Sequence, residues 1–380
     1  MKTLSDFNFE NKKVLLRTDL NSDVVNKKVL MSERIKQASI TIRELKNKKA
    51  KIIILAHQGN PKKQDFISLE QHHNLLNKFT KTKFVKGVIN KKAISEILKL
   101  KPGQALLLDN VRFIKDEFHP ENPNNELIKT LAPLADFYIN DAFSVSHRNH
   151  TSITIFPKYL PSAIGRTLEK ELNAIKKIKI KNNLYILGGA KPEDNIKLLK
   201  GNQVLSCGLF GQLCLIAKGK NLGAQNKYLK KQLILNKNII QKLKTKLKHV
   251  ETPIDFALKI NNKRAELPLN KFPSKYEIFD IGKKTIKKYI SIIKKAKAIY
   301  MKGPAGFCAD KQFAKGTIKI LKAIAASKAF SVIGGGHLSD AIALSKINKS
   351  KFNHISLSGG ALLSYIAGEK LPGLEALEEQ

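Results

Sequence analysis

The segment KVLLRTDLN, residues 13–21, contains the pattern that decides the fold. Its apolar part shows no alternation of polar and apolar residues, which is typical of a strand covered on both faces in a parallel sheet. Polar residues follow at once, at the position where open α/β sheets bind their ligands. The same order of an apolar run and a longer helical pattern recurs along the chain, which predicts repeated βαβ units.

The recurring pattern gives an expected position for each element. Strands are expected at 13–17, 51–56, 105–109, 136–140, 184–188, 203–206, 250–255, 298–301, 330–334 and 354–358, and helices at 33–47, 69–79, 228–248 and 313–327. A chain of 380 residues is too long for one hydrophobic core of ordinary size. We therefore predict an α/β fold of two doubly wound parallel-sheet, Rossmann-like domains joined by a hinge helix.

The sequence RTLEKELNAIKKIK, residues 166–179, separates the two series of strands. Thr167 opens its helical pattern, and Glu169 and Glu171 lie in the first turn, where acidic side chains are favoured. We predict an N-terminal domain over 1–165, an interdomain helix over 166–179, a C-terminal domain over 180–358 and a segment over 359–380 that returns toward the first domain.

The net charge of +38, from 69 basic and 31 acidic residues, is large. It is compatible with binding to nucleic acid or to an anionic membrane, or with helix faces on which lysine is the ordinary solvated residue. The lysines are spread over many predicted helices, and no stacking aromatic residues are interleaved with them. This distribution favours the second interpretation, with no specific nucleic-acid partner and no membrane partner.

The sequence also indicates a cellular compartment. Its start, MKTLSDFNFE, lacks the layout of a signal peptide, and no apolar stretch reaches the length that spans a membrane. Cys207, Cys214 and Cys308 are odd in number and lack metal-ligand spacing, which indicates free thiols in a reducing environment. We therefore expect a cytoplasmic protein.

The front half places basic and polar residues directly after its predicted strands. These are Arg17–Asn21, His57–Pro61, Asp109–Phe113, and Asn140–Phe143 followed by Ser146–His150, with Arg34 at the start of the first helix. Arginine is scarce in a chain that otherwise uses lysine, so its recurrence here indicates planar, bidentate contacts to carboxylate or phosphate. The front half is therefore expected to hold a small anion.

The back half supplies glycine turns after its predicted strands. They are Gly188–Lys191, Lys302–Gly306, Gly334–His337 and Ser358–Ala361. Glycine lets the backbone approach a phosphate closely, and helix N-termini offer unpaired N–H groups to anions. No G-x-x-x-x-G-K-[ST] string occurs, which excludes a P-loop enzyme. The back half is therefore expected to hold a nucleotide.

Taken together, these strings resemble phosphoglycerate kinase along essentially the whole chain. The strings R-x-D-x-N, H-x-G-x-P, N-V-R-F, N-D-A-F…H-R, G-G-A-K, D-I-G, G-P-x-G and G-G-G occur in that family's order and near its spacing. His57-Gln58-Gly59, the string DFISLEQH at 65–72, Gly211-Gln212 and the ending GGGH are similar to the archaeal branch.

The resemblance implies reversible phosphoryl transfer between 1,3-bisphosphoglycerate and ADP, giving 3-phosphoglycerate and ATP with Mg²⁺. Such transfer works by positioning and charge stabilisation. It further implies a monomer whose helix 166–179 acts as a hinge, closing the domains and expelling water.

The resemblance also implies roles for individual residues. Arg34, Lys191 and Gly335 would take part in the transfer itself. Substrate would be bound by Asp19, Leu20, Asn21, Arg34, His57, Gln58, Gly59, Asn60, Arg112, His147 and Arg148. Nucleotide would be bound by Gly189, Ala190, Lys191, Gly208, Lys302, Gly303, Pro304, Ala309, Gly334, Gly335, Gly336 and His337. No protein ligand of the metal is predicted.

Several positions depart from the family's pattern. The arginine of H-x-G-R-P is Asn60, for which Lys62 or Lys63 would substitute. The second lysine after G-G-A-K, which archaeal relatives also lack, is Asn195. The asparagine before G-P is Lys302, and the glutamate near the ribose hydroxyls is Ala309. His337 stands where many members have an aspartate near the metal, and the middle glycine turn is Ser206-Cys207-Gly208. Because most changes affect the nucleotide side, we expect a raised Michaelis constant for ATP.

Two other hypotheses remain at this point. A catalytically weakened homologue would bind anions without turnover, which Asn60 and Ala309 favour and the retained arginines disfavour. A basic nucleic-acid-associated protein would rest on charge alone and would bind with steep salt dependence.

Overall fold

The computed structural model describes residues 1–178 and 183–379, without the side chains at 336, 337 and 340. The chain divides into two compact units: the first unit comprises Met1–Leu172 and Gly360–Gln380, and the second unit comprises Asn173–Gly359. Helix α6 (Arg166–Ile178) begins in the first unit and ends in the second. Lys179, the last residue of the predicted interdomain helix, and residues 180–182 lie outside the described part of the chain.

The first unit is built on a six-stranded parallel sheet with the order β5-β6-β4-β1-β7-β8. The strands are β1 (Lys13–Thr18), β4 (Lys51–Leu55), β5 (Lys83–Val85), β6 (Ala105–Leu108), β7 (Phe137–Asp141) and β8 (Ser162–Ile164). Leu15 lies beside Ile53 on one side and Tyr138 on the other, and all three side chains are fully buried. Val14 and Leu16, on the opposite face, are buried too, so the apolar run reflects a strand covered on both faces.

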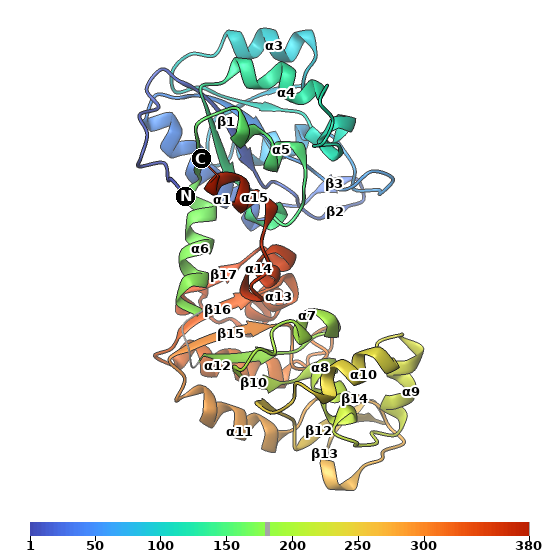
Figure 1. Cartoon of the computed structure of the whole chain (residues 1–380). Coiled ribbons are helices and arrows are strands. Elements are labelled where there is room, and N and C mark those ends of the chain that lie inside the picture. Colours follow the sequence, from blue (N-terminus) through green and yellow to red (C-terminus); the bar gives the residue numbers. More distant parts are fainter. Residues whose placement is uncertain (179–182, 380) are drawn as a thin grey trace. The chain divides into compact units, whose positions relative to one another are not determined.

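Helices and short turns cover this sheet (Figure 1). They are α1 (Glu33–Asn47), α2 (Glu70–Leu76), α3 (Lys91–Leu98), α4 (Glu126–Leu131), α5 (Thr151–Thr154) and α15 (Pro372–Glu378), with the 3-10 turns η1 (Val111–Phe113), η2 (Lys115–Phe118), η3 (Ala132–Leu134), η4 (Phe143–Val145) and η5 (Phe156–Lys158). Helix α14 (Gly359–Ile366) begins at the last residue of the second unit and continues in the first. A two-stranded hairpin joins β2 (Val24–Val25) to β3 (Lys28–Val29). The C-terminal helix α15 returns to this unit, where Gly373 N–H donates to the Ser146 carbonyl at 2.9 Å.

The second unit repeats the design with the parallel order β11-β10-β9-β15-β16-β17. Its strands are β9 (Leu184–Leu187), β10 (Gln203–Ser206), β11 (Val250–Glu251), β15 (Ala298–Lys302), β16 (Phe330–Gly334) and β17 (His354–Ser356). Its helices are α7 (Pro192–Ile196), α8 (Gly208–Ala217), α9 (Ala224–Lys231), α10 (Lys237–Lys244), α11 (Lys283–Ile293), α12 (Lys315–Ala326) and α13 (Gly336–Ser345), with η6 (Leu269–Lys271) and η7 (Lys349–Lys351). Apolar side chains of α11, α12 and α13 form one core with those of β9, β15 and β16. The predicted α/β class with two parallel sheets is confirmed.

Two local predictions in the second unit are wrong. The helix expected over 228–248 is two helices, α9 and α10, because Leu233 adopts a φ of 57° and interrupts the helical backbone between them. The strand expected over 250–255 ends at Glu251, and a new strand, β12 (Asp255–Ile260), begins after Pro253. Pro253 carries no N–H for a sheet ladder, which agrees with the break at this point.

Strand β12 belongs to a separate antiparallel sheet that the sequence pattern did not predict. Its order is β13-β12-β14, with β13 over Lys263–Pro268 and β14 over Ile278–Ile281. Strand β13 is only partly buried along its length, so it lacks the apolar run that identified the other strands. Phe256 and Ile278 nevertheless pack with Leu222 in a small core of their own.

Candidate functional site

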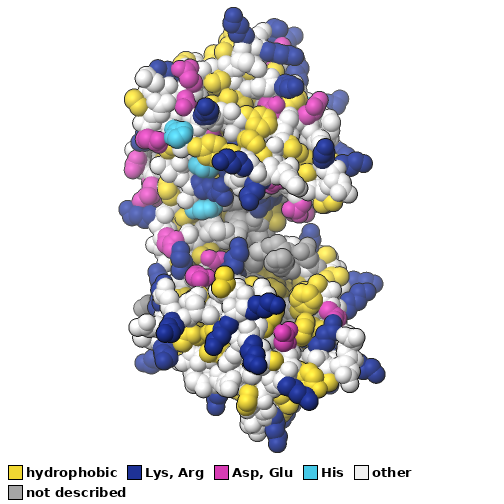
Figure 2. All heavy atoms as spheres, turned by 90° about the vertical axis from the view of Figure 1, so that its right-hand side faces the viewer, with side chains coloured by type: hydrophobic (Ala, Val, Ile, Leu, Met, Phe, Trp, Pro, Cys, Tyr) yellow, Lys and Arg dark blue, Asp and Glu magenta, His cyan; other side chains and the backbone are white. Residues whose placement is uncertain are grey.

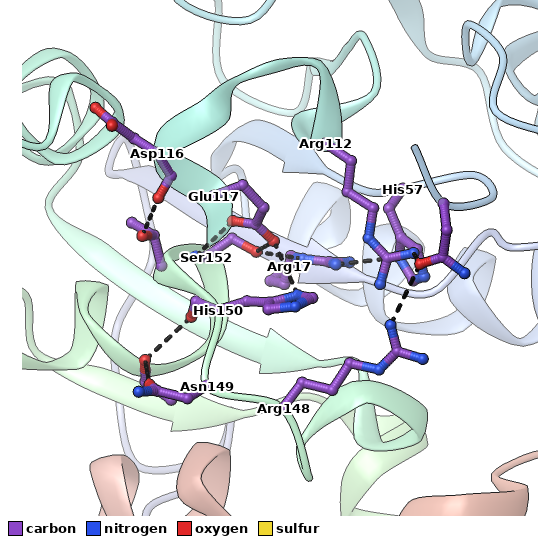
Figure 3. A network of polar contacts seen from close by, with 12 residues as sticks. Arg17, His57, Arg112, Asp116, Glu117, Arg148, Asn149, His150 and Ser152 are labelled. Carbon is purple, nitrogen blue, oxygen red and sulfur yellow. Dashed lines mark hydrogen bonds and ion pairs between the residues drawn. The ribbon is translucent and has the colours of Figure 1, made fainter. Parts of the chain in front are cut away.

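The loops that follow the strands of the first unit bring four basic side chains together (Figure 3). They are Arg17 from β1, His57 after β4, Arg112 in η1 and Arg148 after η4. Their charges act on one another: Arg17, Arg112, Arg148 and Arg34 each help to lower the pKa of His57, after burial itself. We call these residues, with Asp19, Asn21, Arg34 and His147, the anion site.

Asn110 fixes the loops beneath the anion site. Its amide nitrogen donates to the carbonyls of Gln58 at 2.8 Å and Ile67 at 2.9 Å, and its oxygen accepts from Arg112 N–H at 3.1 Å. Asn110 is fully buried, so these three bonds satisfy a side chain that would be costly to bury unpaired. The side chain of Asn110 thereby fixes the loop after β4 against the loop after β6.

Arg17 lies behind the site. Its side chain is fully buried and donates to Ser152 Oγ at 2.8 Å and to the Thr18 carbonyl at 2.5 Å. The remaining nitrogen lies 3.1 Å from His57 Nδ1. Arginine can only donate, so His57 Nδ1 accepts and the ring proton resides on Nε2. Burial and the arginine charges keep the pKa of His57 well below its ordinary value, so His57 is a neutral donor through Nε2.

Glu117 supplies a buried carboxylate next to Arg17. It accepts hydrogen bonds from the Ser152 N–H at 2.9 Å and the Ser152 hydroxyl at 2.7 Å. His150 Nδ1 lies 3.7 Å from the same carboxylate. Burial raises the pKa of Glu117, and the charge of Arg17 opposes that rise. Ser152 therefore bridges the buried Glu117 carboxylate and the buried Arg17 guanidinium and fixes both of them in place.

Arg112 has unused hydrogen-bonding capacity. One terminal nitrogen donates to the Gly59 carbonyl at 2.5 Å and to Asn60 Oδ1 at 3.0 Å. Its Nε and its other terminal nitrogen are buried without a partner, although the side chain is only 4% exposed. Burial and the neighbouring arginines lower the pKa of Arg112 to about 10. A buried guanidinium with two parallel donors free is suited to receive an oxyanion.

Asn60 stands where a further arginine was expected by resemblance. Its oxygen accepts from Arg112 at 3.0 Å and from Arg148 at 3.5 Å, so it links the two guanidinium groups. Lys62 and Lys63, which were expected to substitute for the missing arginine, are exposed. No side-chain contact joins either lysine to the anion site in the described structure.

One end of the anion site is an ion pair between Asp19 and Arg34, whose charged groups are 3.0 Å apart. Ser144 donates its hydroxyl to the same carboxylate of Asp19. Asn21 Oδ1 accepts from Gly59 N–H at 2.8 Å, and its backbone N–H donates to Asp19 Oδ1 at 3.0 Å. The loop after β1 is thus tied to the loop after β4.

Three other predicted substrate-binding residues differ in their surroundings and in whether they have a polar atom available to a ligand. Leu20 is fully buried in the core under α1. The Gln58 amide is occupied by the Ser22 backbone at 2.9 and 3.0 Å and by His72 Nε2 at 2.9 Å. His147 is half-buried, with Nδ1 unpartnered, and burial lowers its pKa. Of these three, His147 has a polar atom to offer a ligand.

The second unit contains a cavity of about 680 Å³. Its lining includes the predicted residues Gly189, Ala190, Gly208, Pro304 and Ala309, together with Gln225, Tyr228, Glu277, Phe279, Phe307 and Cys308. The Phe279 and Phe307 ring centroids are 6.0 Å apart at an interplanar angle of 76°. A mostly apolar lining with a few polar groups is typical of a site for a small molecule or cofactor.

The glycine turns beside this cavity pack against one another. Gly188 N–H donates to the Lys302 carbonyl at 2.7 Å, and Gly189 N–H donates to the Pro304 carbonyl at 3.1 Å. A Cβ on Gly303 would lie 2.6 Å from the backbone of Gly188, so glycine is required there by close approach of the two turns. Part of the glycine signal therefore reflects packing between turns.

Predicted phosphate-binding groups lie at the ends of the same strands. Lys191 is the exposed N-cap residue of α7, and Lys302 ends β15, where its Nζ lies 3.3 Å from Asp194 Oδ2. Gly334 ends β16 and Gly335, with a φ of 105°, is the N-cap of α13, which begins at Gly336. The side chain of His337 lies outside the described part of the structure.

Sequence reasoning did not assign roles to Glu117, Ser152, His150 and Glu277. His150 carried a signal, since it stands in the string SHRNH after a predicted strand. Glu117 and Ser152 carried no such signal, because the role of each depends on a contact between two residues that are 35 positions apart in the sequence. Within residues 1–178 and 183–379, no group of three or more His, Cys, Asp or Glu side chains is placed to hold a metal ion.

Basic side chains do not gather in one patch on the face that Figure 2 displays. Lysine and arginine side chains are scattered there among apolar, acidic and uncharged ones. Among the described helices, none is long and apolar enough to cross a membrane.

The comparisons with known proteins agree on one family. The family model described as Phosphoglycerate kinase matches residues 4–369. Curated phosphoglycerate kinases of Sulfurisphaera tokodaii and Methanothermus fervidus are 40% and 38% identical, over 98% and 99% of this chain and 95% and 97% of theirs. The crystal structure of the Pyrococcus horikoshii phosphoglycerate kinase is similar, with a TM-score of 0.89, 35% identity, and coverage of 100% of this chain and 98% of that one. The structure of the Coxiella burnetii phosphoglycerate kinase gives 0.84 and 28%, covering 99% and 98%.

Proposed function

The chain belongs to the phosphoglycerate kinase family, and from this premise we propose how its residues carry out the family's reaction. That reaction is the reversible transfer of a phosphoryl group between 1,3-bisphosphoglycerate and ADP, giving 3-phosphoglycerate and ATP. The curated relatives at 36–40% identity are phosphoglycerate kinases from archaea, in agreement with the archaeal features of the sequence. The enzyme is a kinase, and the finer assignment, a phosphotransferase with a carboxyl group as acceptor, is part of the proposal.

The observation that carries the proposal is the pair of unpartnered donors on Arg112. A buried guanidinium with free N–H groups costs free energy unless an anion occupies the site. 3-Phosphoglycerate offers a carboxylate and a phosphate, which are the oxyanions that arginine binds in bidentate fashion. We assign Arg112, Arg148, His57 and His147 to hold these groups.

The remaining front-half residues orient the substrate. Asp19 and Asn21 meet its hydroxyl and carboxylate, and Arg34 stabilises the charge of the transferring phosphoryl group. Arg34 is paired to Asp19 at 3.0 Å, so its guanidinium is held before substrate arrives. Positioned charge of this kind provides most of the catalysis in phosphoryl transfer, which needs little proton chemistry.

In the second unit the cavity holds the base and ribose, and its strand-end turns hold the phosphates. Lys191 and Lys302 supply cationic groups, and the turn at Gly334–Gly336 offers helix-terminal N–H groups to the transferred phosphate. Ala309 lines the cavity where the family has a glutamate, so the ribose hydroxyls lose a carboxylate partner. A raised Michaelis constant for ATP follows from that loss.

Mg²⁺ is part of the proposal as well. A magnesium ion at a phosphoryl-transfer site is held by one or two carboxylates together with substrate phosphates, and it needs no cage of protein ligands. One described residue fits this mode: Asp194 presents one carboxylate, 38% exposed, at the start of α7. Asp194 would hold the ion, which supplies neutralising charge for the phosphates. A cytoplasmic monomer without a nucleic-acid or membrane partner completes the proposal.

A coupled assay of ATP consumption with 3-phosphoglycerate tests this function. We expect turnover that requires 3-phosphoglycerate and Mg²⁺ and is lost in Arg34→Ala. A wild-type protein that is inert at millimolar ATP would instead indicate the weakened homologue. Binding to nucleic acid that falls steeply with salt would indicate the basic binding protein. No described contact favours either of these alternatives.

A further inference from the structure

Two strings of the first unit that are similar to the archaeal branch contact each other. They are His57-Gln58-Gly59 and DFISLEQH at 65–72, and the contact places His72 Nε2 2.9 Å from Gln58 Oε1. Both side chains are fully buried, and the Gln58 amide is occupied on its other side by the backbone of Ser22. A buried polar pair so close to the anion site, with no group turned to a ligand, needs a role of another kind.

The backbone of Ser22 fixes the direction in which the Gln58 amide faces. Ser22 N–H donates to Gln58 Oε1 at 2.9 Å, and Gln58 Nε2 donates to the Ser22 carbonyl at 3.0 Å. Because Gln58 Oε1 can only accept, His72 donates through Nε2 and its Nδ1 carries no proton. His72 Nδ1 is buried without a partner, and burial lowers the pKa of His72 to about 4. At neutral pH the His72 ring is therefore uncharged and donates to Gln58.

The residues directly before Ser22 hold Arg34. One terminal nitrogen of Arg34 lies 3.0 Å from Asp19 Oδ2 and 3.5 Å from the Asn21 carbonyl. Both partners belong to the short segment that ends at Ser22, so a shift of the Ser22 backbone would move both of them. The position of the Arg34 guanidinium therefore depends on the bonds that hold Ser22.

A second link joins Ser22 to the helix that carries Arg34. Ser22 Oγ donates to the Leu20 carbonyl at 2.9 Å, so it accepts in its contact with Ser32 Oγ at 2.7 Å. Ser32 is the N-cap residue of α1 and accepts from Ile35 N–H at 3.5 Å. Arg34 is the second residue of that helix. Ser22 is thus tied both to the partners of Arg34 and to the start of its helix.

We propose that His72 is a positioning residue for phosphoryl transfer, which holds Arg34 in its working orientation through Gln58 and Ser22. His72 itself contacts no substrate, and Gln58 serves the site by fixing the loop after β1. Orientation before the substrate arrives is what a transfer that works by positioned charge requires. The inference rests on the proposed function, from which Arg34 takes its role. The competing interpretation is that His72 only packs α2 against the loop after β4.

Steady-state kinetics of His72→Leu separate these two roles, because leucine removes the donor at similar volume. We expect kcat to fall about tenfold while the KM for ATP is unchanged, since misplacing a group that acts in the transition state lowers kcat. Glutamine carries its amide nitrogen near the position of histidine Nε2, so His72→Gln should recover most of kcat. His73→Leu is the matched control: His73 is the next residue of α2, and its Nδ1 lies 3.0 Å from Thr82 Oγ1, outside this chain of bonds. It should leave kcat unchanged.

Hydrogen exchange at the Ser22 amide tests the same bonds without turnover. Because Ser22 N–H donates to Gln58, we expect faster exchange in His72→Leu than in the wild type, and exchange at the wild-type rate in His72→Gln. Unchanged exchange in His72→Leu would overturn the inference. If His72→Leu unfolds, His72→Asn breaks the same bond, because its shorter amide does not reach Gln58.

The kinetic outcomes distinguish this inference from the proposed function. A His72→Leu enzyme with the kcat of His73→Leu, or a folded His72→Gln enzyme no faster than His72→Leu, would show that His72 only supports the fold. Absent turnover in the wild type would contradict the proposed function. Full turnover in the wild type with kcat unaltered in His72→Leu would contradict this inference alone.

Discussion

The two proposed binding regions of this molecule would capture a phosphorylated ligand with different parts of the chain. The first unit uses side chains: Arg17, Glu117 and Arg112 are buried and oriented by hydrogen bonds before any ligand arrives. The second unit uses backbone turns that pack on one another, an apolar cavity and lysines at strand ends.

The difference determines how each region responds to substitution. A buried guanidinium that loses its ligand contact leaves charges uncompensated, so single side-chain changes in the first unit have large effects. Backbone donors in the second unit remain when a side chain is changed, so the effects of single substitutions there are smaller. The following predictions test this contrast, from the largest expected effect to the smallest.

Arg112→Ala has the largest expected effect. It removes both free donors and the bridge to Asn60, so we expect kcat/KM for 3-phosphoglycerate to fall roughly a thousandfold, as for truncation of a buried charged partner. Steady-state kinetics with varied 3-phosphoglycerate and varied ATP measure the change, and the KM for ATP should stay near the wild-type value.

Arg43→Ala is the matched control for Arg112, because Arg43 is exposed on α1 and outside the anion site. It should leave both Michaelis constants unchanged. An Arg112→Ala enzyme with unaltered kcat/KM for 3-phosphoglycerate would remove Arg112 from the anion site.

Acid should destabilise the first unit more than the second. Among the side chains that the structure describes, the histidines with lowered pKa values lie in the first unit: His57, His72, His73, His147 and His150. Burial lowers the pKa of His72 to about 4 and that of His150 to about 3. Below the ordinary histidine pKa the unfolded chain then binds more protons than the folded one, so stability is complete above about pH 6.5 and falls as the pH falls. At pH 5 the loss is about 2 kcal/mol for each of these two histidines.

Two buried aspartates have the opposite effect on the pH dependence of stability. Because one lies in each unit, their contributions cancel when the acid sensitivities of the two units are compared. Burial raises the pKa of Asp141 in the first unit and of Asp280 in the second to about 6. Each therefore favours the folded state as the pH falls through 6. Hydrogen exchange at pH 7 and pH 5, corrected for intrinsic rates, measures each unit separately. His72→Gln should reduce the acid loss in the first unit, and equal acid sensitivity of the two units would contradict the prediction.

Ala309→Glu should have a modest effect on the nucleotide side. A carboxylate in the cavity wall regains a partner for the ribose hydroxyls, and a charge-assisted hydrogen bond at an exposed position predicts a KM for ATP lowered by about three- to tenfold. Lys311→Glu introduces the same carboxylate on an exposed residue absent from the cavity lining and serves as the control. Unchanged kinetics in Ala309→Glu would contradict the assignment of the predicted weak ATP binding to Ala309.

The smallest effect concerns the thiols of the second unit. Cys207 and Cys214 are buried, and burial raises the pKa of Cys214 to about 12 and that of Cys207 further. Cys308 is partly exposed and lines the cavity. Iodoacetamide should therefore modify Cys308 in the native protein, and ATP should slow that reaction. Peptide mass spectrometry would contradict this result if Cys207 or Cys214 reacted first.

The contrast between the units also explains what the sequence could predict. Strands such as β1 and β9 were predictable because a strand buried on both faces needs a continuous apolar run, and that run is local in sequence. The positions of Arg112 and Lys191 near the ends of strands were predictable because these residues follow apolar runs closely in the sequence. The antiparallel sheet at β12–β14 was not, since β13 is half-exposed and lacks the run.

The side-chain network of the first unit could not be predicted for a related reason. Nothing near Glu117 or Ser152 in the sequence indicates that a serine will bridge an acid and Arg17, because that relation depends on the folded positions of three separate segments.

The most direct test of the division between the units is ligand protection measured by hydrogen exchange in the wild-type protein. We predict that 3-phosphoglycerate alone protects amides at 57–60, 110–113 and 147–152, and that ADP alone protects amides at 188–191, 206–209 and 302–309. Protection of the same segments by both ligands, or ADP protection concentrated at 57–60 and 110–113, would contradict the account.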